Sequence, residues 1–362
     1  MIVTSADGLG GESGAMDVKL PVNPEIFKLV GQIERFRDVW AGGTTLSPDT
    51  LATLRRIARS QSAASSCRIA GIRVTDAEVE AILAGARSSA EEHGEIAGYG
   101  AAIDQAFPRF GPIVTTGEIA SLNAVVIGKP GNPPPPSALR ESPLHLEVFD
   151  AEGRAQGRVL QTLPPRLLHD KFEDVVSWLE LELRSGDQHA LLVIGAIFIY
   201  CSATSPFERG NGRTARVMLP HLLRRAGYGF VDYSSLERVF DEMRFAYYDA
   251  IDHAETKIWT PEADLAPWLA FFLESLQALT IRLQTRIDVE TRARELPPLQ
   301  RAILDVIREH GTGAAAQLIA STGANRNTLK DNLRRLVEGG LLERVGSKRG
   351  TFYRLPDAPA KD

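Results

Sequence analysis

"SPFERGNGRTAR", residues 205–216, places two glycines, an asparagine and three arginines between an apolar run and a helical pattern. Glycine permits positive φ and lets backbone N–H groups approach a ligand closely. The helix that follows would direct its free N–H groups and positive dipole end at the same place. Arg213 and Arg216 lie on its first turn, and each guanidinium offers a planar fork of donors suited to phosphate. The stretch predicts an oligophosphate pocket; the alternative is a helix start whose arginines pair with carboxylates elsewhere.

Helical periodicity dominates on both sides of this stretch. The apolar run "HALLVIGAIFIY", residues 189–200, predicts a buried core helix, because crossing a bilayer takes about 20 apolar residues. Earlier in the chain, helix starts are marked by Asn23-Pro24, by Ser47-Pro48 and by a capping box from Thr75 to Glu78. Later helices are expected over residues 168–185, 188–201, 214–227, 234–253 and 263–294.

One region between the helices follows a different pattern. Four consecutive prolines within residues 125–143 exclude a helix and predict an extended path. The alternating piece "LHLEVFD" beside them predicts a small β-hairpin.

The sequence changes character at residue 295. From there to residue 356 it predicts three short helices and a two-stranded tip, the order of a winged helix-turn-helix domain. Residues 296–355 carry ten Lys/Arg against five Asp/Glu, whereas the whole chain has a net charge of -5. Such side chains could contact phosphates and base edges of DNA; a protein-docking module is the alternative. The candidate DNA-binding residues are Arg326, Lys330, Arg334 and Arg335 on the third helix, with Arg344, Lys348 and Arg349 on the wing.

Length and composition limit the number of domains and the kinds of site that the chain can form. The chain has 362 residues, enough for two or three domains, and only two cysteines, which excludes a disulfide framework or a thiolate zinc cluster. Residues 1–22 have no signal-peptide pattern and predict a flexible tail. A cytoplasmic protein without a membrane span is expected.

The motif at residues 205–216 resembles the core motif of Fic-domain proteins, His-Pro-Phe-x-Asp/Glu-Gly-Asn-Gly-Arg-x-x-Arg, in which nine of twelve positions are fixed. The resemblance covers roughly residues 25–290. It implies an all-α bundle with a small β-hairpin flap, followed here by the winged helix-turn-helix domain. It places an N-terminal helical region at residues 23–110 and the Fic domain at 111–294.

The activity that the resemblance implies is AMPylation, the transfer of AMP from ATP to a hydroxyl of a target protein. By position, the residues that would hold the nucleotide phosphates are Gly210, Asn211, Gly212, Arg213 and Arg216. Phe207 would anchor the loop in the core. The expected ligand is therefore ATP, and a protein target and a homodimer are left open.

Two positions depart from the family motif. Ser205 stands where the family has its catalytic histidine, and a serine hydroxyl is too weak a base to accept the proton of the attacking hydroxyl. Arg209 stands where the family has the acidic Mg²⁺ ligand, which puts Mg²⁺ in doubt; the neighbouring Glu208 is the only substitute in the loop. His189 and His221 are interpreted as structural.

A third departure lies in the inhibitory motif, Ser/Thr-x-x-x-Glu-Gly/Asn, whose glutamate pairs with the second motif arginine. The stretch "SCRIAG" matches it at Ser66 and Gly71, but the glutamate is Ala70. The hypothesis that best fits all three departures is a nucleotide-binding protein with weakened or lost AMP transfer, coupled to DNA binding. An active adenylyltransferase with an atypical site, and a DNA-binding regulator that uses the bundle as a scaffold, remain alternatives.

Overall fold

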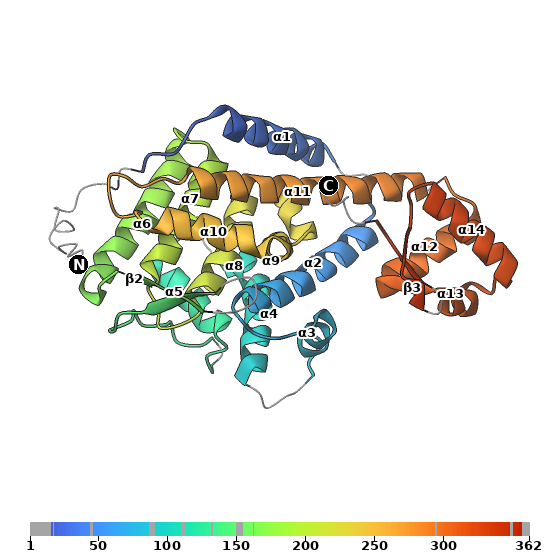
Figure 1. Cartoon of the computed structure of the whole chain (residues 1–362), viewed down its shortest axis with the longest axis horizontal. Helices are drawn as coiled ribbons and strands as arrows, with labels where there is room; N and C mark the ends of the chain where they lie inside the picture. The colour runs from blue at the N-terminus through green and yellow to red at the C-terminus, as the bar shows by residue number, and fades with distance from the viewer. Residues whose placement is uncertain are drawn as a thin grey trace. The chain divides into compact units, whose positions relative to one another are not determined.

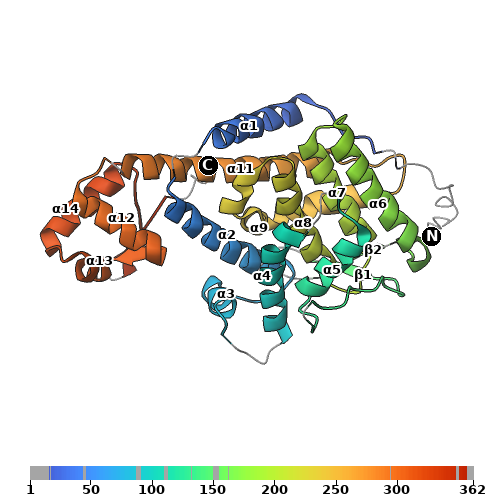
Figure 2. The same cartoon turned by 180° about the vertical axis from the view of Figure 1, so that it is seen from behind.

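The computed structural model describes residues 16, 18–43, 46–86, 91–109, 113–131, 133–149, 155–161, 163–293, 295–347 and 350–356. The chain divides into two compact units. The larger comprises Met1–Arg37 and Leu54–Gln277, and the smaller comprises Asp38–Thr53 and Ala278–Asp362. The division falls inside three helices, α1, α2 and α11. Figures 1 and 2 label these helices.

The larger unit is built almost entirely from helices. In chain order the elements that lie wholly or partly in it are α1 (Pro24–Ala41), α2 (Pro48–Ile69), α3 (Asp76–Leu83), α4 (Glu91–Arg109), α5 (Thr116–Val126), β1 (His145–Phe149), β2 (Ala155–Gln161), α6 (Pro165–Ser185), α7 (Ala190–Thr204), α8 (Asn211–Arg225), the 3₁₀ helix η2 (Gly229–Tyr233), α9 (Leu236–Glu242), α10 (Arg244–Glu255) and α11 (Ala266–Ala293). Along the described part of the chain, no helix combines the length and apolar content needed to cross a membrane.

Helix α7 forms the centre of the larger unit. Every residue from Leu191 to Cys201 is buried, and a helix that is apolar on all faces is stable only inside a protein. α6 and α8 pack against it (Figure 1). Trp268 of α11 stacks on Phe198 with 4.7 Å between the ring centroids. The predicted core helix is confirmed, although it ends at Thr204 rather than at residue 201.

The predicted helix starts are also observed. Asn23 Oδ1 accepts a hydrogen bond from Ile26 N at 2.9 Å, and Ser47 Oγ accepts one from Thr50 N at 3.1 Å. Thr75 forms the expected capping box at the start of α3. Each side chain satisfies a backbone N–H that the first helical turn leaves without an intrahelical partner.

The segment predicted as one helix over residues 234–253 forms two helices. α9 ends at Glu242, and α10 begins at Arg244 after Met243, whose φ of -103° and ψ of 31° interrupt the helical geometry. The interrupted segment contains neither glycine nor proline. The break therefore depends on tertiary packing, which local sequence patterns do not report.

The predicted hairpin is formed by β1 and β2, which pair antiparallel with His145 opposite Gln161. The register shifts between Glu147 and Phe149, as at a β-bulge. The proline-rich stretch before β1 has no regular structure over its described residues, as its sequence predicts.

The smaller unit contains α12 (Pro298–His310), β3 (Thr312–Ala314), α13 (Ala315–Thr322), α14 (Arg326–Glu338), β4 (Glu343–Val345) and β5 (Phe352–Arg354). The strands form one antiparallel sheet in the order β3-β5-β4. The sequence pattern identified the three helices and the β4–β5 tip but not β3. The core of the smaller unit consists mainly of leucines and isoleucines, among them Ile303, Ile307, Leu318, Leu329 and Leu333.

Candidate functional site

The loop between α7 and α8 carries the motif, and Ser205 is its first residue. Ser205 has φ 41°, a left-handed conformation that few residues other than glycine adopt. It is 3% exposed, and its hydroxyl donates to the carbonyl oxygen of Ser202 at 2.6 Å. The hydroxyl at the position of the family's histidine therefore takes part in a hydrogen bond inside the fold.

Arg140 ties this loop to the base of the hairpin. Its Nε donates to the carbonyl of Ser205 at 2.8 Å, while Nη1 and Nη2 donate to the carbonyls of Ser142 and Leu163 at 2.8 and 2.6 Å. Ser142 precedes β1 and Leu163 follows β2, so one guanidinium joins both ends of the hairpin to the motif. Burial lowers the pKa of Arg140.

Phe207 and Asn211 fix the shape of the loop. Phe207 is 2% exposed and meets Phe172 edge to face at 6.0 Å between ring centroids. Asn211 Oδ1 accepts from Phe207 N at 2.9 Å, and Asn211 Nδ2 donates to Phe207 O at 2.7 Å. Phe207 thus lies in the core where the motif resemblance places it. The side-chain amide of Asn211, predicted to hold phosphate, binds the loop backbone in this structure.

Gly210 begins α8 in a conformation that favours glycine, with φ 80°. A Cβ at this position would lie 2.5 Å from Ile127 Cγ2 and 3.0 Å from Asn123 Nδ2. Asn123 Nδ2 in turn donates to Arg209 O and Thr214 Oγ1, both at 3.0 Å. The loop is therefore packed closely against α5, and the helix start has no side-chain cap.

Arg213, on the first turn of α8, pairs with Glu95 of α4. Arg213 Nη1 lies 2.8 Å from Glu95 Oε2, and Arg209 Nη1 lies 3.3 Å from Glu95 Oε1. The side chain of Arg213 is 6% exposed and that of Arg209 49%. The positive charge of Arg213 also acts on the thiol of Cys67 in α2. Burial raises the pKa of that thiol to about 11, and Arg213 opposes the rise. Glu95 thus bridges two arginines of the motif.

Arg216, one turn further along α8, is buried among neutral groups. Its Nε and Nη2 donate to Ser66 Oγ and Ser66 O at 2.8 and 3.1 Å, and its Nη1 donates to the hydroxyl of Tyr247 at 3.1 Å. Burial alone would lower the pKa of Arg216, but Tyr247 and Tyr99 outweigh it and the pKa is raised. The hydrogen-bond partners found for this guanidinium among the described residues carry no formal charge.

Ser66 also connects Arg216 to a buried carboxylate. Tyr99, which interacts with Ser66, donates from its hydroxyl to Glu237 Oε1 at 3.0 Å. Ser62 donates to Glu237 Oε2 at 2.7 Å, and Glu237 is 2% exposed. A buried cation and a buried anion therefore lie at the two ends of one hydrogen-bonded chain.

The three inhibitory-motif positions lie at the C-terminal end of α2. Ser66 contacts Arg216, whereas Ala70 and Gly71 form the turn that ends the helix, with φ 87° at Gly71. This end of α2 therefore reaches the second motif arginine through a hydroxyl and a carbonyl.

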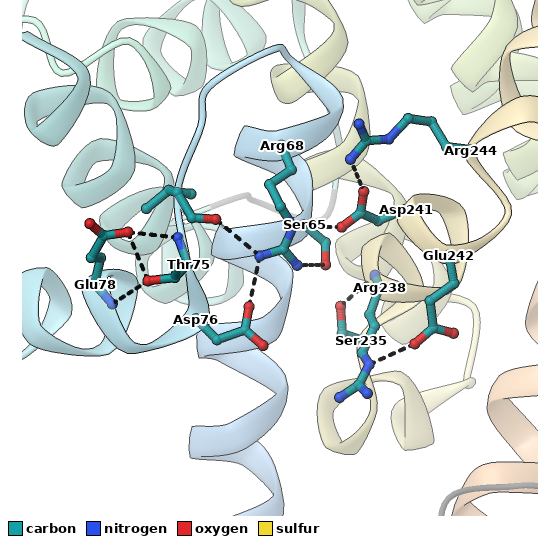
Figure 3. A network of polar contacts seen from close by, with 11 residues as sticks. Ser65, Arg68, Thr75, Asp76, Glu78, Ser235, Arg238, Asp241, Glu242 and Arg244 are labelled. Carbon is teal, nitrogen blue, oxygen red and sulfur yellow. Dashed lines mark hydrogen bonds and ion pairs between the residues drawn. The ribbon is translucent and has the colours of Figure 1, made fainter. Parts of the chain in front are cut away.

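Arg68 holds this end of α2 in place, as Figure 3 shows. Its guanidinium donates to Asp241 Oδ2 and Asp76 Oδ1, each at 2.7 Å, and to Ser65 Oγ at 3.0 Å. Asp241 also pairs with Arg244. One arginine therefore fastens α2 to both α3 and α9.

The residues around the motif do not fit Mg²⁺. Glu208 is exposed and its Oε1 accepts from the backbone N of Glu141 at 3.4 Å, whereas Glu95 is bridged by Arg209 and Arg213. Two guanidiniums beside the partly buried carboxylate of Glu95 repel a divalent cation. Within the described ranges, no three His, Cys, Asp or Glu side chains form a group that could hold a metal ion.

The two histidines interpreted as structural, His189 and His221, lie at the start of α7 and on α8. His189 begins α7, at the opposite end from Ser205; its Nδ1 caps the helix and its Nε2 lies 3.6 Å from Glu34 Oε1. His221 is buried, and burial together with Arg225 and Arg224 lowers its pKa to about 4.

Sequence reasoning missed Glu95, Arg140 and Tyr247. All three are distant in the sequence from the motif, so spacing cannot associate them with it. The one local signal was the pair Gly94 and Gly98 flanking Glu95, a pattern that permits close helix packing.

The four candidate DNA-binding residues of α14 are all exposed to solvent. Arg326, Lys330, Arg334 and Arg335 are exposed, while Leu329, Leu333 and Leu336 of the same helix are buried. Arg344 on β4 is exposed as well. Lys348 and Arg349, the other two candidates, lie outside the described residues.

Solved structures of Fic-family proteins resemble this chain. A Fic family protein from Desulfovibrio desulfuricans G20 matches over 96% of this chain and 100% of its own, with 20% identity and a TM-score of 0.61. A Fic domain containing signaling protein from Bacteroides thetaiotaomicron VPI-5482 matches over 71% and 95%, with 17% identity and a TM-score of 0.53. Fic-1 from C. elegans matches over 73% of each chain, with 19% identity and a TM-score of 0.58.

No protein-family model and no curated protein matches the chain. The structural matches show that the chain has the fold of Fic-family proteins, and the predicted all-α bundle with a β-hairpin is confirmed.

Proposed function

We propose that this chain is a Fic-family protein that binds ATP or a related nucleotide through residues 210–216, with AMP transfer to protein hydroxyls weakened or lost. Binding is coupled to DNA recognition by a winged helix-turn-helix domain at residues 295–356. The observation that carries the nucleotide proposal is the concentration of buried positive charge at the start of α8. Arg213 is 6% exposed and Arg216 4%, directly after the left-handed Gly210.

Burying a guanidinium is costly unless it gains strong partners. Arg216 has only neutral partners among the described residues, and Arg213 shares one carboxylate with Arg209. A nucleotide phosphate would supply the missing negative charge, and the N-terminus of α8 would add its dipole.

Weak or absent transfer is supported by the two departures from the motif. The Ser205 hydroxyl donates to a backbone carbonyl and cannot accept a proton near neutral pH. Arg209 pairs with a carboxylate at a position where the family motif has an acid. Both changes leave phosphate binding intact while removing proton transfer and the loop's metal ligand.

The proposal for residues 295–356 rests on the helices and on charge. α13 and α14 follow one another across Gly323-Ala324-Asn325, and the antiparallel β4 and β5 follow α14. The exposed face of α14 is basic while its other face packs into the core, as a helix placed on DNA requires.

The nucleotide proposal is tested by calorimetric titration of the full chain with ATP. Arg213→Ala is expected to weaken binding by about 1.5–3 kcal/mol, the value of a charge-assisted hydrogen bond. Arg59→Ala is the matched control, because Arg59 also pairs with a carboxylate of α4, Asp104, but lies outside the motif. A melting temperature that saturating ATP leaves unchanged would contradict the proposed site.

A further inference from the structure

Glu95 occupies a position between two arginines that a phosphate group could also occupy. Each of its carboxylate oxygens faces one guanidinium, Oε1 that of Arg209 and Oε2 that of Arg213. The three side chains come from α4, from the loop and from α8. The two guanidiniums are thus spaced to hold neighbouring oxygens of a single anion.

The backbone of α4 is fixed at this point. A Cβ on Gly98 would lie 2.4 Å from Val125 O, and a Cβ on Gly128 would lie 2.6 Å from Gly94 O. α4 therefore approaches the end of α5 more closely than other residues would allow. Glu95 lies between the two α4 glycines, so its position next to the loop is set by the packing of the helices.

The contact between Glu95 and Arg213 is short but poorly aligned. Arg213 Nη1 lies 2.8 Å from the carboxylate, yet this buried atom makes no hydrogen bond of good geometry with any described residue. A buried donor without an aligned acceptor costs free energy. The carboxylate therefore supplies charge to Arg213 without satisfying the Nη1 donor.

Two of the motif's positive charges share one carboxylate. Arg209 and Arg213 each bring one positive charge, and the Glu95 carboxylate contacts both. A phosphate group carries more negative charge and one more acceptor oxygen than a carboxylate, and a guanidinium fork binds either anion. Exchanging the carboxylate for phosphate would improve both charge and hydrogen bonding.

We propose that Glu95 is an exchangeable internal anion, which holds Arg209 and Arg213 until a phosphate group of the ligand displaces it, without a divalent cation. The inference rests on the proposed nucleotide site and adds to it a third phosphate-binding arginine, Arg209. In this arrangement Arg209 supplies the positive charge that a metal ion would bring.

The test is calorimetric titration of the full chain with ATP and with pyrophosphate, in Mg²⁺ and in EDTA. Glu95→Gln removes the competing charge and is expected to tighten binding by about tenfold to hundredfold. The factor should be the same for both ligands, because the displaced group is the same. It should not change in EDTA, and Arg209→Ala should weaken binding of both ligands.

Asp104→Asn is the matched control, since Asp104 lies on the same helix and pairs with Arg59 at 2.6 Å, away from the motif; it should leave both affinities unchanged. If Glu95→Gln does not fold, Glu95→Asp takes its place in the test. It keeps the charge on a shorter side chain, and it should bind both ligands more tightly than the unaltered chain does, by a smaller factor than the one expected for Glu95→Gln.

Two kinds of failure are distinguishable. In the first, the unaltered chain binds the ligands, but Glu95→Gln binds them equally or more weakly, or binding requires Mg²⁺. Either result would overturn this inference and would not contradict the nucleotide site. Failure of the unaltered chain and of both folded Glu95 variants to bind either ligand would overturn the nucleotide site and this inference together.

Discussion

At the scale of single residues, the proposed function assigns ligand binding and the loss of transfer to different positions of the motif. Gly210, Arg213 and Arg216 keep a tight helix start and two buried guanidiniums. Ser205 and Arg209 occupy the positions of the family's base and acid, and both make contacts that catalysis would not need. These contacts are the reason for proposing a site that binds without proton transfer.

This separation predicts that transfer can be restored. Ser205→His combined with Arg209→Asp is expected to produce AMP transfer, because an imidazole titrates near neutral pH and a carboxylate can bind Mg²⁺. The gain from the base alone is about 10²–10⁴-fold. It is measured as covalent label from α-labelled ATP on the protein or on lysate proteins. Equal labelling by the unaltered chain would contradict a weakened activity.

The residue scale also shows where sequence reasoning is sufficient. Phe207 and Gly210 could be placed from the motif, because an anchored aromatic and a left-handed glycine are local requirements of the loop. Glu95 and Tyr247 could not, because their contacts with the arginines depend on the packing of α4 and α10 against α8. Asn211 is predicted to bind the ligand, which stays a prediction; the contact of its amide with the loop backbone could not be predicted from the sequence.

At the scale of elements, the end of α2 is fixed from two sides. Ser66 holds Arg216, while Arg68 reaches Asp76 at the start of α3 and Asp241 on α9. The helix end next to the motif is therefore fastened by charged contacts as well as by apolar packing. Its position determines how Ser66 meets Arg216.

Arg68→Ala is expected to destabilise the protein by about 1.5–3 kcal/mol, since hydrogen bonds to two carboxylates are lost and Asp241 is largely buried. Amide exchange in the last turn of α2 should become faster. Urea denaturation measures the first effect and hydrogen exchange the second. Arg238→Ala is the control, because its pair with Glu242 is within one helix and partly exposed, and should cost less than about 1 kcal/mol. Equal losses would contradict the role assigned to Arg68.

Elements differ in how well sequence patterns predict them. Caps at Asn23, Ser47 and Thr75 and the apolar run of α7 were predictable, because local hydrogen bonds and hydrophobicity determine them. The break at Met243 and strand β3 were not, because neither has a marker in its own residues.

At the scale of the whole molecule, the proposal joins a nucleotide site and a DNA-binding domain in one chain. Nucleic acid must then be held by local charge, because the chain as a whole is acidic with a net charge of -5. The exposed arginines and lysine of α14 provide that local charge.

Lys330→Ala and Arg334→Ala are each expected to reduce the slope of log K against log salt by about 0.9, the contribution of one phosphate contact on duplex DNA. Fluorescence anisotropy with a labelled duplex over a salt series measures the slope. Arg301→Ala, an exposed arginine on α12, should leave it unchanged. Absence of duplex binding at low salt would favour a protein-docking module instead.

The hydrogen bonds of Asn211 affect how readily this asparagine is deamidated over time. Asn211 is followed by Gly212, and in an Asn-Gly sequence the next backbone nitrogen readily attacks the side-chain carbonyl and releases ammonia. Here that carbonyl accepts a hydrogen bond from Phe207 N while the backbone starts a helix, a geometry that opposes ring closure. We therefore expect folding to slow deamidation of the motif, a reaction that would replace the amide donor with a carboxylate facing Phe207 O and add negative charge to the proposed phosphate site.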